Sequence, residues 1–197
     1  MKGFWIELQK KLATLLKLEP LDISKIEHIV GVDVSYKNKK AVAVVQNFKS
    51  GKIIEIVSET IEEEFPYVPG LFCFREGPAV VKVLSKTKTK YELILVDGHG
   101  YAHPRRAGLA SIVGLLLDKP SIGVAKNLLI GKVKDKNRIS PILDKDEIIG
   151  YRIKGKERTF FVSPGHKIDL ESVLKFFETT NYEYPLVLKM ADKLSKR

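Results

Sequence analysis

A short apolar strand that ends on an acid constrains this chain more than any other feature. Residues 93–97, Leu-Ile-Leu-Val-Asp, are typical of a strand buried in a sheet core. Within nine residues Asp97 is followed by glycines, an imidazole and two guanidinium groups, at Gly98, Gly100, His103, Arg105 and Arg106. Such charged and polar residues pack poorly in a hydrophobic core, but they are suited to holding a metal ion next to a phosphate. The segment therefore indicates acid, metal and phosphate chemistry at one strand end.

Hydrophobic periodicity predicts helices and strands in a mixed order. We expect an amphipathic helix over residues 4–18 and a helix over 71–85, which Gly77-Pro78 must interrupt or restart. The predicted strands are 28–36, 41–48, 53–61, 91–97 and 121–125, with further strands and turns over 130–163. Three more helices are expected over 105–118, 170–179 and 186–195.

This order predicts an α/β domain with a mixed sheet and helices on both faces. The first three strands are expected to be antiparallel, and the later strands to be joined by crossover helices. A β-β-β-α-β-α-β order is that of an RNase H-like domain. At 197 residues, with no repeat and no linker, the whole of 1–197 is predicted to be a single domain.

Composition excludes several classes of protein. No apolar run is long enough to span a bilayer, which needs about 20 residues. The N-terminal segment carries Glu7 and lysines within its apolar pattern, so it is not a signal peptide. A single cysteine, Cys73, cannot form an internal disulfide or a cysteine-based zinc site. We expect a cytoplasmic protein, acting as a monomer, with no membrane partner.

The charge distribution favours a polyanionic partner. The formal net charge is +10, and residues 98–197 hold 19 Lys and Arg against 11 Asp and Glu. A basic excess of this size favours nucleic acid and points to the second half as the phosphate-facing one. The alternative is a lysine-rich surface typical of heat-adapted proteins.

Two acids occupy equivalent positions on predicted strands. Asp33 interrupts the apolar run Ile29–Val34 and points to the face opposite Val32. If its strand neighbours the strand of Asp97, the two carboxylates meet at one sheet edge. Like charges about 4 Å apart repel by several kcal/mol, so either one carboxyl is protonated or a cation lies between them. Oxygen ligands favour Mg²⁺ or Mn²⁺, and Glu76 on the predicted helix is a candidate third acid.

The basic residues near these acids have both functional and structural interpretations. His103 is a candidate to orient or deprotonate an attacking water, and Lys126 to neutralise a phosphate; a helix cap and a solvated loop lysine are the alternatives. Arg105 and Arg106 at a helix start oppose the macrodipole, which indicates a bound anion. His166, predicted to lie on a tight turn, could reach the same site or be an ordinary loop histidine.

The loop Pro66-Tyr67-Val68-Pro69-Gly70 presents an aromatic ring on a rigid backbone. An enzyme that acts at a base must remove that base from the stack, and a held ring can fill the gap. The alternative is that Tyr67 packs under its own loop.

With these residues assembled, the chain resembles the endonuclease V family of deoxyinosine-specific repair nucleases. The resemblance runs from about residue 28 to residue 192. It rests on the ordered blocks GVDVSY, PYVPGLFCFREGP, DGHGYAHPRRAGLAS, GVAKNLL, SPGH and MADKLS.

The resemblance implies an RNase H-like fold and Mg²⁺-dependent hydrolysis, with Mn²⁺ as a substitute. The cut would fall at the second phosphodiester bond 3′ to the inosine and leave 3′-hydroxyl and 5′-phosphate ends. Its partner would be DNA containing deoxyinosine, with inosine-containing RNA as a second possibility. Besides an endoribonuclease, a non-catalytic nucleic-acid-binding module of RNase H-like fold is an alternative function.

The resemblance also assigns roles to residues. Asp33, Asp97 and Glu76 would hold the metal ion, and His103 and Lys126 would assist the chemistry. Tyr67 would be the wedge at the lesion, with the glycines Gly70, Gly98 and Gly108 letting backbone groups line the hypoxanthine pocket. Three positions depart from the family pattern: His99 replaces a glutamine, Ile112 a histidine and Lys189 an arginine.

Overall fold

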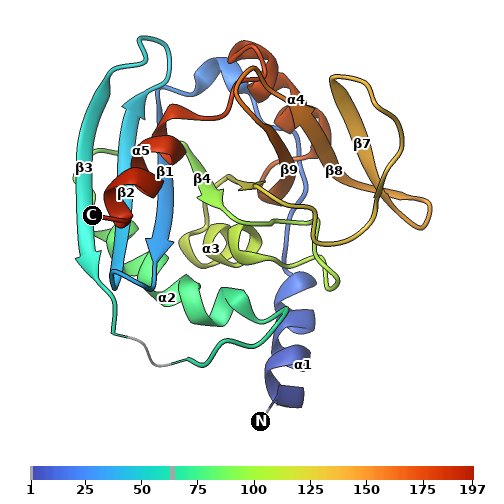
Figure 1. Cartoon of the computed structure of the whole chain (residues 1–197), viewed down its shortest axis with the longest axis horizontal. Helices are drawn as coiled ribbons and strands as arrows, with labels where there is room; N and C mark the ends of the chain where they lie inside the picture. The colour runs from blue at the N-terminus through green and yellow to red at the C-terminus, as the bar shows by residue number, and fades with distance from the viewer. Residues whose placement is uncertain (1, 63–64) are drawn as a thin grey trace.

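A nine-stranded mixed sheet forms the centre of the computed structural model (Figure 1), which describes residues 2–62 and 65–197. The strands follow one another across the sheet in the order β3-β2-β1-β4-β5-β9-β8-β7-β6. In chain order they are β1 (His28–Ser35), β2 (Lys40–Asn47), β3 (Ile53–Thr60), β4 (Leu93–Asp97), β5 (Ser121–Ala125), β6 (Lys132–Val133), β7 (Ile139–Asp144), β8 (Glu147–Lys154) and β9 (Thr159–His166).

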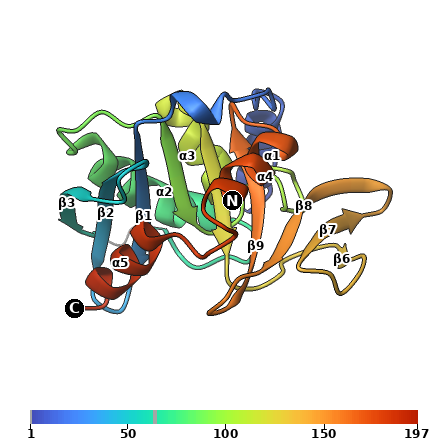
Figure 2. The ribbon, with the colours of Figure 1, turned by 90° about the horizontal axis from the view of Figure 1, so that it is seen from above.

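Helices cover both faces of this sheet. They are α1 (Lys2–Ala13), a 3₁₀ turn η1 (Ile23–Lys25), α2 (Phe72–Ser85), α3 (Leu109–Leu117), α4 (Leu170–Thr179) and α5 (Leu186–Ser195). Seen from above, α5 and α4 lie on one side of the sheet and α2 and α3 on the other (Figure 2). None of these helices combines the length and apolar composition that a membrane-spanning helix needs.

The alternation of side chains along the central strands creates two cores. On β1, Ile29 packs with Val187 and Phe176 of the α4–α5 side, whereas Val30 and Val32 pack with the α2–α3 side. Burying both strand faces explains why 93–97 is a continuous apolar run. The predicted α/β fold, with a mixed sheet and helices on both faces, is confirmed.

The sheet topology is also as predicted from the element order. β1 pairs antiparallel with β2, and β2 with β3. β4 is parallel to both β1 and β5, and the crossover connections carry α2 and α3. Because β1 and β4 are parallel neighbours, their carboxyl ends meet at the same edge of the sheet.

Two helix boundaries and one predicted helix interruption differ from the prediction. The first helix ends at Ala13 rather than at residue 18, because the backbone N–H of Lys17 bonds the ring of His166 instead of continuing the helix. The second runs through Pro78 without interruption. Proline removes one N–H there, and the packing of Val80 and Val83 on the sheet holds the helix together.

The third helix begins at Leu109, four residues later than predicted. Before it, the chain folds over itself: the N–H groups of Gly108 and Ala110 donate to the carbonyls of Gly100 and His99. Arg106 has a φ of 57°, which is incompatible with a right-handed helix. The loop 98–108 is therefore a compact turn at the end of β4.

Candidate active site

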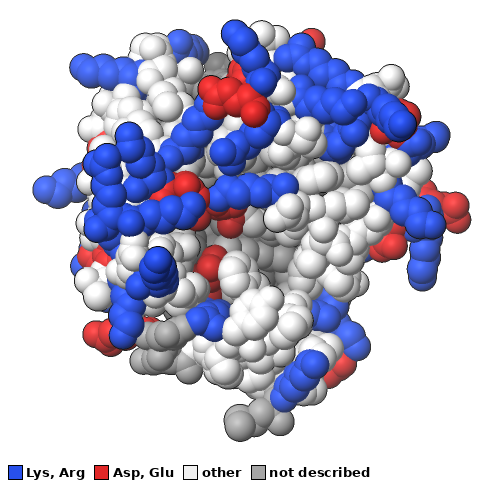
Figure 3. Space-filling model, in the orientation of Figure 1, with Lys and Arg blue, Asp and Glu red and all other residues white. Residues whose placement is uncertain are grey.

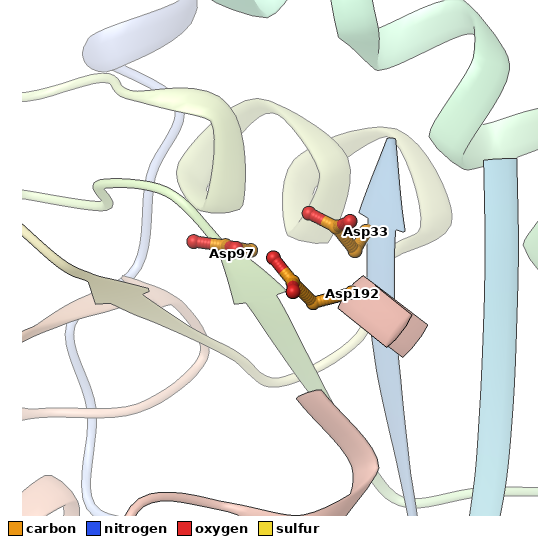
Figure 4. Close-up of side chains that lie close together, drawn as sticks. All are labelled: Asp33, Asp97 and Asp192. Carbon is orange, nitrogen blue, oxygen red and sulfur yellow. The ribbon is translucent and has the colours of Figure 1, made fainter. Parts of the chain in front are cut away.

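Three carboxylates converge where β1 and β4 end. Asp33 comes from β1, Asp97 from the last position of β4 and Asp192 from α5, and their side chains point toward one another (Figure 4). Each acid offers an oxygen within 4.8 Å of an oxygen of the other two. The predicted meeting of Asp33 and Asp97 at one sheet edge is therefore what the structure has, with a third acid above them.

Strand alternation aims these acids at α5. The last registered pair between the two parallel strands is Val32 with Val96, and the acids follow one residue later on the opposite face. That face is the one against which α5 packs. Helix and strand can approach closely because Gly31 has no side chain; a Cβ there would lie 2.6 Å from Val187. The close approach brings Asp192 over the sheet edge.

Lys126 lies between two of the acids. Its Nζ is 2.6 Å from Asp97 Oδ2 and 2.7 Å from Asp192 Oδ1. Lys196 Nζ makes a second pair with Asp192 at 2.7 Å, and Ser195 Oγ donates to Asp33 Oδ2 at 2.7 Å. Burial lowers the pKa of the Lys126 ammonium, but its hydrogen bonds to Asp192 and Asp97 outweigh this and raise it.

These lysines leave part of the negative charge uncompensated. Burial, together with the neighbouring Asp97, raises the pKa of Asp33 to about 6. Glu76 of α2 is only 6% exposed, and burial raises its pKa to about 9, helped by the charges of Asp33 and Asp97. The charges of Asp33 and Asp97 therefore act on Glu76, although Glu76 does not belong to the cluster of three acids whose oxygens meet.

The donor set fits a divalent cation. Hard carboxylate oxygens are the ligands that Mg²⁺ and Mn²⁺ prefer, and the Lys126 ammonium already occupies a cation position between two of them. Burial is the main cause of the raised pKa values of Asp33 and Glu76, and the charge of the neighbouring acids adds to it, so a bound cation would favour their ionised forms.

A cavity of about 410 Å³ opens after the ends of β4 and β5, and its wall includes Gly98 and Asn127, the residues that follow Asp97 and Lys126. Its wall includes Tyr67, Gly70, Phe72, Cys73, Gly98, His99, His103, Gly108, Leu109, Asn127 and Leu129. All three glycines predicted to line a base pocket are in this wall.

Two of those glycines are required by the backbone. Gly70 has a φ of 78°, which favours glycine. At Gly108 a Cβ would lie 2.3 Å from the carbonyl oxygen of His99, so the loop can close on itself only without a side chain there. At these two points the cavity wall consists of backbone. A pocket that recognises a base through peptide groups requires such a wall.

Tyr67 and His103 occupy opposite environments in this wall. Tyr67 is 64% exposed, with its ring edge-to-face against Phe72 at 6.3 Å, so it is presented rather than buried. His103 is buried, and its Nδ1 accepts from the Arg105 backbone N–H at 3.2 Å. Burial and the charge of Arg105 lower the pKa of His103 to about 4, so its imidazole is neutral near pH 7.

Comparison with known proteins agrees with this geometry. The family model described as Endonuclease V matches residues 10–193. The chain belongs to the endonuclease V family. It is 40% identical to an endonuclease V of Sulfurisphaera tokodaii over 194 residues, which cover 98% of this chain and 93% of that protein.

Solved endonuclease V structures share the fold. That of Streptomyces avermitilis superposes with a TM-score of 0.89 at 32% identity, covering 100% of this chain and 92% of that one. The Ciona intestinalis endonuclease V, in complex with a 24mer DNA containing an inosine followed by a ribo-adenosine, gives 0.85 at 27% identity, covering 98% and 95%. The chain is thus a nuclease of the endonuclease V family.

Two arginines of this endonuclease V are not placed as predicted. Arg105 and Arg106 precede α3 rather than starting it, and their guanidinium groups are paired within the protein. Arg105 donates to Gln9 Oε1 and to the Gly70 carbonyl. Arg106 forms ion pairs of 2.7 Å with Asp144 and Glu147. These contacts hold the loop 98–108, and the helix-dipole argument does not apply because α3 begins only at Leu109. Binding of the substrate by the two arginines stays a prediction.

His166 does not reach the acid cluster. It is the last residue of β9 rather than part of a turn, and it is 1% exposed. It pairs with Ser121 at the start of β5, whereas Asp97 pairs with Val124 near the end of that strand. The sequence reasoning placed His166 by its turn-like Pro-Gly neighbours, which here lie within a strand.

Asp192 is the site residue that the sequence reasoning missed. The block MADKLS was noticed, but its acid was not assigned a role. A signal was present: Asp192 follows Leu188 by four residues and precedes Ser195 by three, so it shares the inward face of an amphipathic helix. An acid on that face is costly unless it has a partner.

The surface around the site carries both acidic and basic side chains. Figure 3 shows carboxylates in the hollow at the middle of this face, with Lys and Arg side chains around it. Lys126 and Lys196 contribute to this basic surround through their pairs with Asp97 and Asp192. The arrangement is suited to a polyanion whose backbone passes over an acidic, cation-binding centre.

Proposed function

We propose that this protein is a Mg²⁺-dependent DNA-repair endonuclease that recognises deoxyinosine and hydrolyses the second phosphodiester bond on its 3′ side. The observation that carries the proposal is the position of the Asp33–Asp97–Asp192 cluster directly beside a glycine-walled cavity with an exposed tyrosine at its rim. The inosine-containing DNA bound by the Ciona relative supports the choice of substrate.

The cation would be held by Asp33, Asp97 and Asp192, with Glu76 as a further acid nearby. When bound, Mg²⁺ would supply Lewis-acid stabilisation of the phosphate charge, and Mn²⁺ would substitute. Lys126, now paired with Asp97 and Asp192, would be released toward the phosphate and neutralise its developing charge. Water attack at phosphorus, with the 3′ oxygen leaving, gives the 3′-hydroxyl and 5′-phosphate ends.

The cavity would receive the flipped base. Its volume of about 410 Å³ accommodates a purine, and its backbone wall at Gly70, Gly98 and Gly108 can read the C6 edge that distinguishes hypoxanthine from adenine. Neutral His103 can accept or relay a proton at this wall. Tyr67, exposed at the rim, would take the place of the base in the stack.

The proposed active form is a monomer in which the acids, Lys126 and the cavity wall come from one chain, and its proposed location is the cytoplasm. The basic surround would bind the strand backbone, and its contribution should weaken with salt.

The test uses end-labelled duplexes with and without a single inosine, in Mg²⁺ and in EDTA, with the cut position mapped. We expect Mg²⁺-dependent nicking at the second phosphodiester bond 3′ to the inosine. Asp97→Asn should abolish this cleavage while retaining binding of the duplex. Asp146→Asn, an exposed acid in the β7–β8 turn, is the matched control. Wild-type cleavage by Asp97→Asn, or cleavage in EDTA, would refute the proposal.

The same assay separates the alternative functions. An inosine-containing RNA strand cut much faster than the DNA strand would identify an endoribonuclease. Binding without cleavage of either strand would identify a non-catalytic module, for which the convergence of three acids has no use.

A further inference from the structure

Tyr184 carries a buried hydroxyl that the proposed function does not use. The residue lies just before Pro185, at the entry to α5, the helix that carries Asp192. Its side chain is 4% exposed, and among the described residues its hydroxyl has no hydrogen-bond partner. A buried hydroxyl normally has a partner, because burying it unpaired costs stability.

The ring of Tyr184 is held firmly by its neighbours. It packs edge-to-face against Phe160 at 5.4 Å between ring centroids, and the Arg158 guanidinium lies 4.9 Å above it. These contacts use the apolar ring alone. A phenylalanine would make the same contacts, so packing accounts for the ring and not for the oxygen.

The surroundings of the hydroxyl point to the acid cluster. Burial raises the pKa of Tyr184, and among the charged groups Asp97 has the largest effect on it, followed by Lys126. Tyr184 in turn acts on the Lys126 ammonium. The phenol therefore stays protonated at neutral pH and remains a hydrogen-bond donor beside the carboxylates of the cation site.

The carboxylates of the cation site already accept hydrogen bonds from Lys126. Asp97 Oδ2 and Asp192 Oδ1 are both bonded to Lys126 Nζ, at 2.6 and 2.7 Å. A divalent cation at these oxygens repels the ammonium, and the carboxylates then need other donors to fix their orientation. Hydrogen bonds from outside the ligand set commonly perform this task at metal sites.

We propose that Tyr184 is a positioning residue of the cation site, whose hydroxyl donates to the oxygen ligands around the cation at Asp97 and gains this partner only when the cation is bound. The inference rests on the proposed function for the cation site itself. It adds a residue that no part of the sequence pattern singled out.

The experiment compares wild type with Tyr184→Phe, which removes the oxygen alone. Tyr182→Phe is the matched control, because it deletes a hydroxyl from the same α4–α5 connection. Mn²⁺ affinity is measured by electron paramagnetic resonance of the free ion, and thermal unfolding is followed in EDTA and in saturating Mn²⁺. We expect Tyr184→Phe to weaken Mn²⁺ binding on the order of tenfold, while Tyr182→Phe has no effect.

Thermal unfolding distinguishes positioning from a purely structural role. In EDTA, Tyr184→Phe should melt at the wild-type temperature or above it, because an unpaired hydroxyl has been removed. Saturating Mn²⁺ should raise the melting temperature of Tyr184→Phe by less than it raises that of the wild type. An unchanged Mn²⁺ affinity, or an equal loss of melting temperature in EDTA and in Mn²⁺, overturns the inference.

The outcome for Asp97→Asn keeps the two proposals apart. If the wild type binds Mn²⁺ and Asp97→Asn does not, the proposed cation site is supported. The result for Tyr184→Phe then tests only the role of Tyr184. If wild type binds no Mn²⁺, the proposed cation site and the role of Tyr184 both fail.

Discussion

Arg105 Nε donates to Gln9 Oε1 at 2.6 Å, and this bond ties the N-terminal helix to the wall of the cavity. Gln9 is fully buried, and its amide donates in turn to the carbonyl of Ala107 at 2.6 Å. The other end of the Arg105 guanidinium bonds the carbonyl of Gly70. Helix α1 therefore braces two segments of the cavity wall that are far apart in the sequence.

Gln9→Ala should lower the free energy of unfolding by about 1–3 kcal/mol, because it leaves buried donors of Arg105 without an acceptor. Urea unfolding measures the change. Glu7→Ala on the same helix removes only an exposed pair with Lys10 and should change stability by less than about 0.5 kcal/mol. Equal effects of the two substitutions would show that the brace contributes nothing.

Asp192→Asn should lower kcat for the inosine duplex by about two orders of magnitude or more, because it removes one of three converging carboxylates. Binding of the duplex in EDTA should stay near the wild-type affinity. Gel shift and single-turnover cleavage measure the two quantities, with Asp146→Asn as control. A variant that cleaves normally would remove Asp192 from the cation site.

Glu76→Gln should stabilise the cation-free protein at high pH. The pKa of this carboxyl is raised to about 9 in the folded state from 4.5 in the unfolded chain. Between these values the folded protein binds more protons than the unfolded chain, so the free energy of unfolding falls as pH rises.

The gain from Glu76→Gln should therefore vanish near pH 4.5 and reach up to a few kcal/mol near pH 8. Chemical unfolding in EDTA across this range measures it, with the exposed Glu178→Gln as control. A gain that is independent of pH would mean that Glu76 is ionised in the folded protein.

Tyr67→Ala should reduce discrimination between inosine-containing and undamaged duplexes by about tenfold, since stacking of a base on an aromatic ring is worth about 1–3 kcal/mol. Mn²⁺ affinity should not change, because the ring lies at the cavity rim and outside the acid cluster. Competition binding with the two duplexes measures the ratio. Leu15→Ala, another exposed apolar residue, is the control, and matched losses in both variants would exclude a wedge.

Periodicity and strand alternation in the sequence determined the sheet and one half of the site. Asp97 ends its apolar strand and Asp33 lies near the end of another, on the same face, and the rule that parallel strands align their carboxyl ends predicts that the two acids meet. The exposed ring of Tyr67 was predictable from its flanking prolines, because backbone restriction is a local property, whereas the glycines of the cavity wall were expected only from the family resemblance.

Only the tertiary structure decided which side chains complete that site. Asp192 meets the strand acids because Gly31 lets α5 approach the sheet. Arg105 donates to Gln9, and Arg106 donates to Asp144 and Glu147. These partners lie 38 to 96 residues away in the chain. Local sequence sets backbone conformation and face, whereas the partner of a long polar side chain is fixed by packing between distant segments.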